Sequence, residues 1–235
     1  MPKDTHACAS AVKHDRIDIL KWLIKHNFPR DEVSYGNAAK NGRLDILALL
    51  KEHNFPLNIT SFIIAISGGH LDSLKWLKEN GCPYNELCSM LAVKHNHFKV
   101  LKWLRENNCP WDWRCYSFAA MNGRLDILKW LRENGCSWSI SCFEHAALKG
   151  NFEILKWLKE NECPWGSSCC YLAASKGRVD ILQWLRENGC SWCAKCYYQA
   201  ARSGHIDVLI FLKKMTVLTI KVVAMVLLKM VILMC

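Results

Sequence analysis

One pattern, a motif that returns every 27 residues, constrains the fold of this chain more than any other feature. A large apolar residue stands at eight equally spaced places, and a leucine precedes each by two residues. The eight are Trp22, Leu49, Trp76, Trp103, Trp130, Trp157, Trp184 and Phe211. Self-similarity at such a period is typical of solenoids and other repeat architectures. The chain therefore divides into repeats 1 to 8 without insertion: 1–27, 28–54, 55–81, 82–108, 109–135, 136–162, 163–189 and 190–216.

Each repeat predicts two short helices. Position 4 of the repeat is Asp, Asn or Ser in six copies, residue types that accept the unpaired N–H groups at a helix start. Position 15 is Gly in six copies, and Gly ends a helix in the left-handed conformation without a steric penalty. A second helix follows, with Leu125, Leu128 and Leu131 on one face, which Ile127 and Trp130 widen.

One such helix pair cannot bury so wide an apolar face, so neighbouring repeats must stack side by side. Alanine occupies position 11 of every repeat and lets the helices approach closely. We expect the tryptophans at position 22 to stack between repeats and to dominate stability, with an upper limit of about 4 to 6 kcal/mol each. These stacking residues are Trp76, Trp103, Trp130, Trp157 and Trp184. The predicted fold class is all-α: a solenoid of about eight stacked helix-turn-helix repeats.

The segment "AAMNGRLDILKWLRENG" (Ala119 to Gly135) resembles the ankyrin repeat, and the resemblance covers residues 1–216. Together with the "CPWD" that opens repeat 5, it is similar to the short, Trp-rich ankyrin-like repeats encoded by giant DNA viruses of amoebae. The repeat is about six residues shorter than the usual 33, and "RCYSF" (Arg114 to Phe118) replaces the Thr-Pro-Leu-His motif. The resemblance implies an ankyrin-like solenoid without long β-hairpins.

The resemblance also implies a protein-binding adaptor, one that a virus uses against host proteins. If position 11 faces the core, positions 6, 9 and 13 face outward and position 10 lies at the border. Residues there differ between repeats, which suits a recognition surface and equally suits unconstrained drift. The candidate partner-binding residues are Arg114, Ser117, Phe118, Met121, Ser141, Glu144, His145, Leu148, Tyr171 and Leu172, with Trp113 or Phe118 as an aromatic anchor. We expect a monomer in the cytoplasm, or in the nucleus, with an unknown protein partner.

Two alternatives remain open at this stage. The net charge of +10 and the basic residues at positions 21 and 24 allow contact with nucleic acid. Glutamates at position 25 interrupt the basic stripe, which favours a solvated face with i, i+4 ion pairs. The second alternative is a non-functional fragment of a longer repeat gene, since "MPKD" occupies the "CPWD" slot at the start.

Cysteines offer the one candidate metal site. Cys190, Cys193 and Cys196 have C-x2-C-x2-C spacing, which suits zinc or an iron–sulfur cluster. Cysteine also recurs at positions 1 and 7 of other repeats, so small buried thiols are the favoured interpretation. The sequence holds no recognisable nucleophile–base pair or phosphate-binding loop, and lacks a secretory signal. We therefore expect reduced thiols, no metal or cofactor, and no enzymatic activity.

The last segment, 217–235, departs from the repeat. It is apolar and together with Thr216 long enough to cross a bilayer. Its possible codons, read one base back, permit Glu-Asn-Asp-Cys-Pro-Tyr-Asp at the start of a ninth repeat and a glycine in register with Gly204. We therefore favour a frame change at the A-rich codons of Lys213 to Met215, and an out-of-frame ninth repeat over a membrane anchor.

Overall fold

A computed structural model describes residues 4–216 of the chain, and all regular structure in that range is helical. The fifteen bounded helices are α1 (Ala7–Lys13), α2 (Ile17–Lys25), α3 (Ser34–Lys40), α4 (Leu44–Glu52), α5 (Ile59–Ile66), α6 (Leu71–Glu79), α7 (Glu86–Lys94), α8 (Phe98–Glu106), α9 (Arg114–Met121), α10 (Leu125–Glu133), α11 (Ser141–Lys149), α12 (Phe152–Glu160), α13 (Ser168–Ala174), α14 (Val179–Glu187) and α15 (Ala194–Arg202). A further helix covers 206–216. The predicted all-α class is confirmed.

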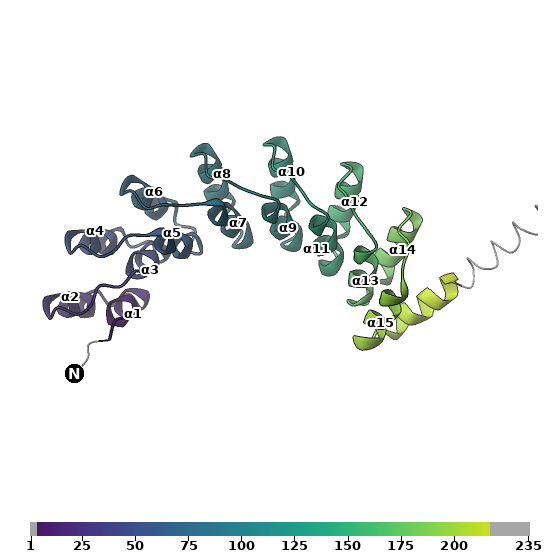
Figure 1. The fold of residues 1–235 in the computed structure, drawn as a ribbon, viewed down its shortest axis with the longest axis horizontal. Coiled ribbons are helices and arrows are strands. Elements are labelled where there is room, and N and C mark those ends of the chain that lie inside the picture. Colours follow the sequence, from purple (N-terminus) through teal and green to yellow (C-terminus); the bar gives the residue numbers. More distant parts are fainter. Residues whose placement is uncertain (1–3, 217–235) are drawn as a thin grey trace, which may run out of the picture. The chain divides into compact units, whose positions relative to one another are not determined.

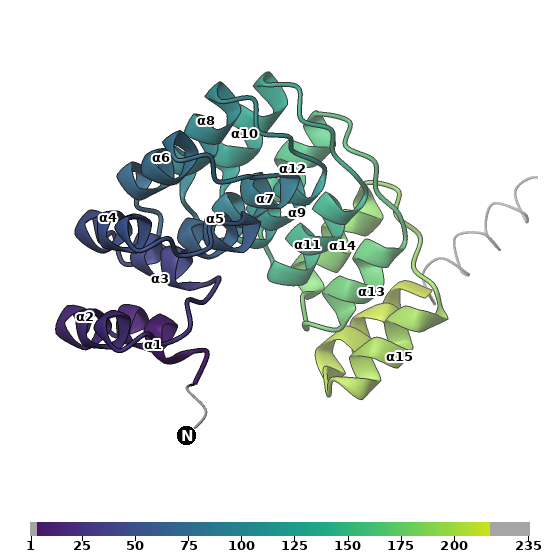
Figure 2. The same ribbon diagram turned by 60° about the vertical axis from the view of Figure 1, so that its left-hand side comes forward.

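The chain forms two compact regions. The first comprises Met1–Asn122 and Lys129–Ser137, and the second comprises Gly123–Leu128 and Trp138–Cys235. In the first region α1, α3, α5, α7 and α9 form a row of first helices, each packed on the next, and α2, α4, α6 and α8 pair with their own first helices (Figure 1). In the second region α11, α13 and α15 form the corresponding row, and Figure 2 shows the same neighbours from another side.

Left-handed residues end both helices of the repeat. At position 15 the six glycines have φ between 70° and 78°, and Asp15 and Asn96 adopt the same conformation in the other two repeats. Gly69 is required on a second ground as well, because a Cβ there would lie 2.4 Å from the His97 ring of the next repeat. The predicted role of position 15 as a helix end is confirmed. Position 27 is left-handed too in repeats 1 to 7.

Side-chain caps occur at the predicted position 4. Asn58 Oδ1 accepts the Ser61 N–H at 3.3 Å, and Asn85 Oδ1 accepts the Leu87 N–H at 3.1 Å. Asp31, Asp112 and Ser139 also accept backbone N–H groups two or three residues later. Such bonds satisfy donors that a helix start leaves unpaired. The predicted helix start is therefore confirmed in repeats 3 and 4, where Asn58 and Asn85 directly precede α5 and α7; in repeats 2, 5 and 6 the first helix begins two or three residues after position 4.

Aliphatic residues, more than tryptophans, fill the centre of the solenoid. Position 23 of the second helix is a buried leucine in all eight repeats, and position 20 is a buried leucine in repeats 1 to 7; in repeat 4, Leu101 and Leu104 are completely inaccessible. The tryptophans of position 22 are half-buried in repeats 3 to 7, and Trp22 is 54% exposed. Position 17, expected on the same buried face, is half-buried or exposed, as at Leu44. Position 19 is buried in its place in repeats 2 to 8, because the helix turns positions 19, 20 and 23 toward the first helices.

The half-buried tryptophans touch aromatic rings of the preceding repeat. Trp103 lies parallel to Phe62 with ring centroids 6.5 Å apart, and Trp130 meets the edge of Phe98 at 5.6 Å. In the second region Trp184 meets Phe152 at 5.7 Å. These rings join neighbouring repeats along one side of the second helices. Their dominance over the aliphatic core remains a prediction.

The predictions for 217–235, a ninth repeat or a membrane anchor, lie outside the described residues. Within 4–216 no helix is both long and apolar enough to span a bilayer. The second helices of repeats 1 to 7 end at position 25, whereas the helix 206–216 continues past that position because the Asn-Gly ending of other repeats is replaced by Met215-Thr216.

Candidate protein-binding surface

Arg114, at the start of α9 in the first region, is held between two carboxylates. Its Nη2 lies 2.6 Å from Asp112 Oδ2 and 3.9 Å from Glu86 Oε1, and its Nε donates to Asp112 Oδ2 at 2.8 Å. The hydrogen bond from Arg114 holds the pKa of Asp112 below its usual range. The Arg114 side chain keeps 31% of its surface exposed. The guanidinium is therefore both ordered and accessible.

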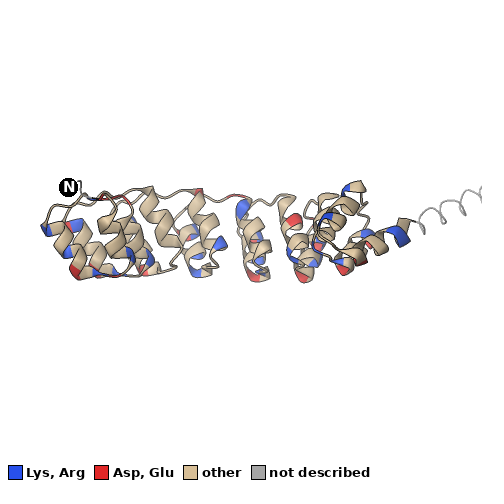
Figure 3. Ribbon diagram, turned by 90° about the horizontal axis from the view of Figure 1, so that it is seen from below, with Lys and Arg blue, Asp and Glu red and all other residues tan. Residues whose placement is uncertain are grey.

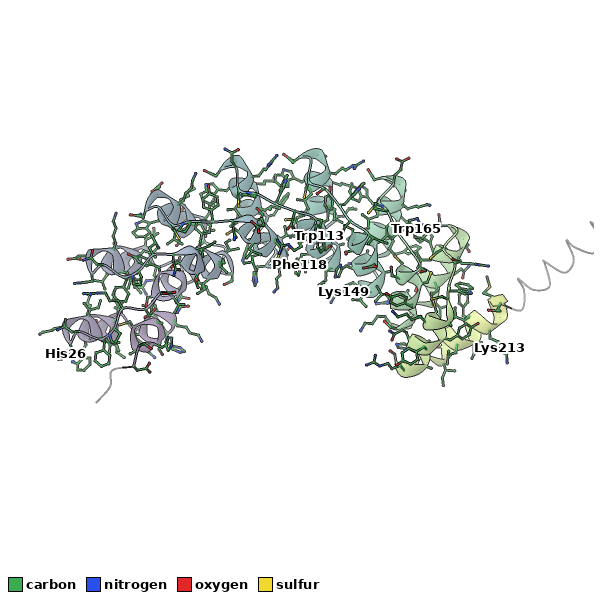
Figure 4. All side chains as sticks on the ribbon, viewed as in Figure 1. His26, Trp113, Phe118, Lys149, Trp165 and Lys213 are labelled. Atoms are coloured by element: carbon green, nitrogen blue, oxygen red, sulfur yellow. The ribbon has the colours of Figure 1, made fainter. Side chains whose placement is uncertain are left out.

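Aromatic side chains lie next to this arginine in sequence. Trp113 is 43% exposed at the N-terminal end of α9. Phe118, one turn further along α9, is half-buried, and Lys94 Nζ of α7 lies 5.8 Å from its ring centroid. Figure 4 labels Trp113 and Phe118 on this part of the first region. Met121, at the end of α9, is half-buried. We define the Trp113 patch as Trp113, Arg114, Phe118, Met121 and Lys94.

Ser117 was expected on the same surface, and that prediction is wrong. Its exposed fraction is 4%. Position 9 faces the first helix of the next repeat: a Cβ placed on Gly36, at the same position, would lie 2.7 Å from Ile64 Cβ. Ser117 Oγ donates instead to the Trp113 carbonyl at 3.5 Å. Small residues at this position therefore serve the packing of first helices.

The candidates in the second region lie on α11 and α13. Ser141, Glu144, His145 and Leu148 are each half-buried, and the His145 ring Nδ1 lies 2.7 Å from the Ser141 carbonyl oxygen. Tyr171 and Leu172 on α13 are half-buried as well. These six residues are therefore accessible only in part, although positions 6, 9 and 13 were expected to face outward, with position 10 at the border.

Two features of the second region were missed at the sequence level. Lys195 Nζ of α15 lies 4.1 Å from the Tyr171 ring centroid, so a cation from repeat 8 covers the aromatic ring of repeat 7. Ile140, directly before α11, is 41% exposed. Position 5 could have been found from the sequence, because it precedes the first helical turn, where no neighbouring helix covers it. The Lys195 contact depends on side-chain rotamers that the repeat pattern does not specify.

Basic residues also gather at the last turns of the first helices. In the first region Lys13, Lys40 and Lys94 at position 13 are exposed. Burial lowers the pKa of nearby His95, and the charges of His97, Lys94 and Lys40 lower it further. In the second region Lys149, Lys176 and Arg202 lie at positions 13 and 14, and all three are exposed. Figure 4 labels Lys149.

The basic stripe of the second helices has another role than expected. Position-24 cations lie over the tryptophan at position 3 of the next repeat: Arg105 is 4.3 Å from the Trp111 centroid and Lys159 is 4.7 Å from Trp165. The sequence predicted i, i+4 ion pairs between the cations at position 21 and the glutamates at position 25. Residues 4–216 form other ion pairs instead; Lys75 Nζ, for instance, lies 3.7 Å from Asp72 Oδ1. Two of the position-21 lysines lie instead over a phenylalanine one turn earlier in the same helix, Lys102 Nζ 4.5 Å from the Phe98 centroid and Lys156 Nζ 4.6 Å from that of Phe152. Basic and acidic segments are interspersed along the helices (Figure 3).

The proposed metal ligands are separated by burial. Cys190 and Cys196 are buried, whereas Cys193 is exposed. Residues 4–216 contain no group of three or more His, Cys, Asp or Glu side chains arranged to hold a metal ion. Burial raises the pKa of the Cys196 thiol to about 11, and those of Cys88 and Cys169 to about 12. Such thiols behave as small apolar side chains.

Comparison with known proteins identifies the repeat. The family model described as "Ankyrin repeats (3 copies)" matches residues 36–112, 62–142 and 116–196, which together span more than half of the 235 residues. The crystal structure of the human ASB11 ankyrin repeat domain is similar, with a TM-score of 0.54 and 19% identity over 67% of this chain and 84% of that one. No curated protein sequence matches the chain. Ankyrin repeats are generally protein–protein interaction scaffolds, and their fold is typically non-enzymatic. The chain belongs to the ankyrin repeat family.

Proposed function

We propose that this protein is a binding scaffold that recognises an acidic protein surface through its first helices. The observation that carries the proposal is the Trp113 patch, where an exposed indole directly precedes an ordered arginine in α9 and an exposed lysine of α7 lies over Phe118 of the same helix. Trp and Arg are the residue types most enriched at the energetic centres of protein interfaces. The indole supplies apolar area, and Lys94 together with the lysines of neighbouring first helices supplies positive charge.

The division of labour between the helices supports this role. The second helices direct their cations at neighbouring aromatic rings, as Arg105 of α8 does at Trp111 in the segment between α8 and α9. On the first helices, Arg114 is pre-ordered by Asp112 and Glu86, so it loses little conformational freedom when a partner binds. In the second region, Lys195 and Tyr171 place a cation against an aromatic ring on two neighbouring first helices. We therefore place recognition on the first helices and stability on the second.

Affinity capture followed by cross-linking mass spectrometry tests the proposal. The purified chain is incubated with cell extract, treated with nuclease or left untreated, at low and high salt. We expect a partner cross-linked to Lys94 or Lys40, with binding that weakens as salt rises because surface charges are screened. Trp113→Ala and Lys94→Glu should each reduce capture at least tenfold, which corresponds to about 1.4 kcal/mol or more.

Trp22→Ala is the matched control, because Trp22 is at least as exposed as Trp113 (54% against 43%) and lies on a second helix. It should leave capture unchanged, and circular dichroism should show that all variants keep their helices. Loss of the partner in Trp22→Ala but not in Trp113→Ala would refute the placement of the surface. Capture that nuclease abolishes would favour nucleic acid instead, and a chain that binds nothing specifically would favour the non-functional fragment.

The finer identity of the partner follows from the resemblance of the repeats to those of giant viruses. On that basis we propose a host protein as the partner, bound by a monomer in the host cytoplasm or nucleus.

A further inference from the structure

One place in the described solenoid brings two cysteines face to face. Side chains at position 8 of one repeat and position 1 of the next meet at two junctions; in repeats 4 and 5, Ser89 Oγ lies 3.4 Å from Cys109 Sγ. At the junction of repeats 7 and 8 both positions are cysteine, and Cys170 Sγ lies 2.7 Å from Cys190 Sγ. Across residues 4–216, this is the one junction at which both positions carry a thiol.

The two thiols differ in their access to solvent. Cys170, on α13, is completely buried. Cys190 is 7% exposed and lines a surface pocket of about 330 Å³ with Trp165, Gly166 and Asn188. That pocket admits a molecule the size of a peroxide or of a small thiol reagent. Cys190 is therefore the sulfur that a reagent meets first.

The surroundings also favour Cys190 as the more acidic thiol. The hydrogen bond from Cys170 lowers the pKa of Cys190, and the nearby Arg186 charge lowers it further. The same hydrogen bond and burial raise the pKa of Cys170. Because the thiolate is the nucleophilic form of cysteine, Cys190 is the member of the pair that attacks.

We propose that Cys190 and Cys170 form a hydroperoxide-reactive dithiol whose oxidation links repeats 7 and 8 through a disulfide. The Cys190 thiolate attacks the peroxide oxygen, the O–O bond breaks, and Cys190 becomes a sulfenic acid as water or an alcohol leaves with the proton. The Cys170 sulfur then attacks the Cys190 sulfur, the S–OH bond breaks, and the hydroxyl leaves as water with the Cys170 proton. The two thiols lose two protons and two electrons, and the peroxide gains them.

The linkage needs little rearrangement and changes the second region locally. A disulfide bond measures about 2.05 Å, so the sulfurs must approach by about 0.7 Å. The bond joins α13 to the segment that leads into α15. α13 carries Tyr171 and α15 carries Lys195, and Lys195 Nζ lies 4.1 Å from the centroid of the Tyr171 ring. Oxidation therefore fixes this pair, and thiol reductants release it.

The test uses the full chain with Cys193→Ser and Cys235→Ser. These substitutions remove the exposed thiol of Cys193 and the thiol of the C-terminal residue. The protein is exposed to a small excess of hydrogen peroxide, blocked with N-ethylmaleimide and cut with trypsin. We expect peptide 160–176 joined to peptide 187–195, lighter by two hydrogens than their sum, and separated again by dithiothreitol. Fragment spectra should place the bond on Cys170, because Cys169 and Cys163 lie in the same peptide.

Two variants decide the assignment. Cys170→Ser reproduces the Ser89 arrangement of repeat 4, so it should fold and should lose at least nine-tenths of the linked peptide. Cys169→Ser, the neighbouring buried thiol, should keep it. Linkage through Cys169 or Cys163, or an oxidised protein in which Cys170 and Cys190 both remain alkylatable after unfolding, would overturn the proposal.

Discussion

The first and second helices of the repeats differ in how much they vary from copy to copy. The second helices α10, α12 and α14 read "LDILKWLRE", "FEILKWLKE" and "VDILQWLRE", with position 20 a buried leucine each time. The first helices α9, α11 and α13 read "RCYSFAAM", "SCFEHAALK" and "SCCYLAA", and share little beyond Cys and Ala at packed positions. The contrast teaches that stacking needs a constant surface, while the accessible part of the first helix is left open to vary.

The largest expected effect comes from breaking the constant side. Leu101→Ala removes a completely buried side chain from α8. We expect the free energy of unfolding to fall by about 2 to 5 kcal/mol, because the lost apolar burial and the resulting cavity both count against the folded state. Urea denaturation followed by circular dichroism measures this.

The control is Lys99→Ala, an exposed position of the same helix, which should change stability by about 0.5 kcal/mol or less. Equal losses in the two variants would show that α8 is not the stabilising element that its burial indicates.

An intermediate effect is expected at the aromatic side of the second helices. Trp103→Ala removes a half-buried ring that stacks on Phe62 and lies 5.9 Å from Lys78 Nζ. We expect a loss of about 2 kcal/mol in the same urea experiment, since only part of the indole area leaves water on folding. Trp22→Ala, with a ring that is 54% exposed, should cost less.

The comparison of Trp103→Ala with Leu101→Ala also tests the sequence prediction that the tryptophans dominate stability. A greater loss for Trp103→Ala than for Leu101→Ala would support that prediction and would contradict the ranking we infer from burial.

The smallest effect is expected on the first helices. Asp112→Asn keeps an acceptor for the Arg114 N–H but removes the charge. The pKa of Asp112 is lowered in the folded state, so its ionisation stabilises the fold above the unfolded pKa of about 3.9 and this contribution disappears as the pH falls through the folded pKa. At pH 7 we expect a loss of up to about 1 kcal/mol, and at a pH below the folded-state pKa no difference from the wild type.

Melting curves at the two pH values measure the Asp112 effect. Asp72→Asn is the control, because Asp72 is 83% exposed and its contact with Lys75 is 3.7 Å long. A difference between Asp112→Asn and the wild type that persists unchanged at low pH would show that the charge is not what stabilises this site.

Much of the fold could be predicted because local rules repeat eight times. Gly at position 15 and Asn or Asp at position 4 have conformational preferences that act within a few residues, and both predictions held in the structure. The candidate surface could be predicted less well. Ser117 is buried because the first helix of the next repeat packs against position 9, a contact that the helical period of one repeat does not contain. The contact of Lys195 with Tyr171 was missed for a related reason, because it joins two repeats.

The sequence by itself determined that this protein is a row of helix pairs, since a 27-residue period with fixed caps and one apolar stripe leaves no other way to bury that stripe. Only the tertiary structure decided which side chains meet across repeats. Arg114 reaches Glu86 of the preceding repeat, Lys195 covers the Tyr171 ring, and Cys170 meets Cys190. Such pairings depend on distances between residues far apart in the chain and on rotamers that neighbouring helices select, and a periodic pattern carries information on neither.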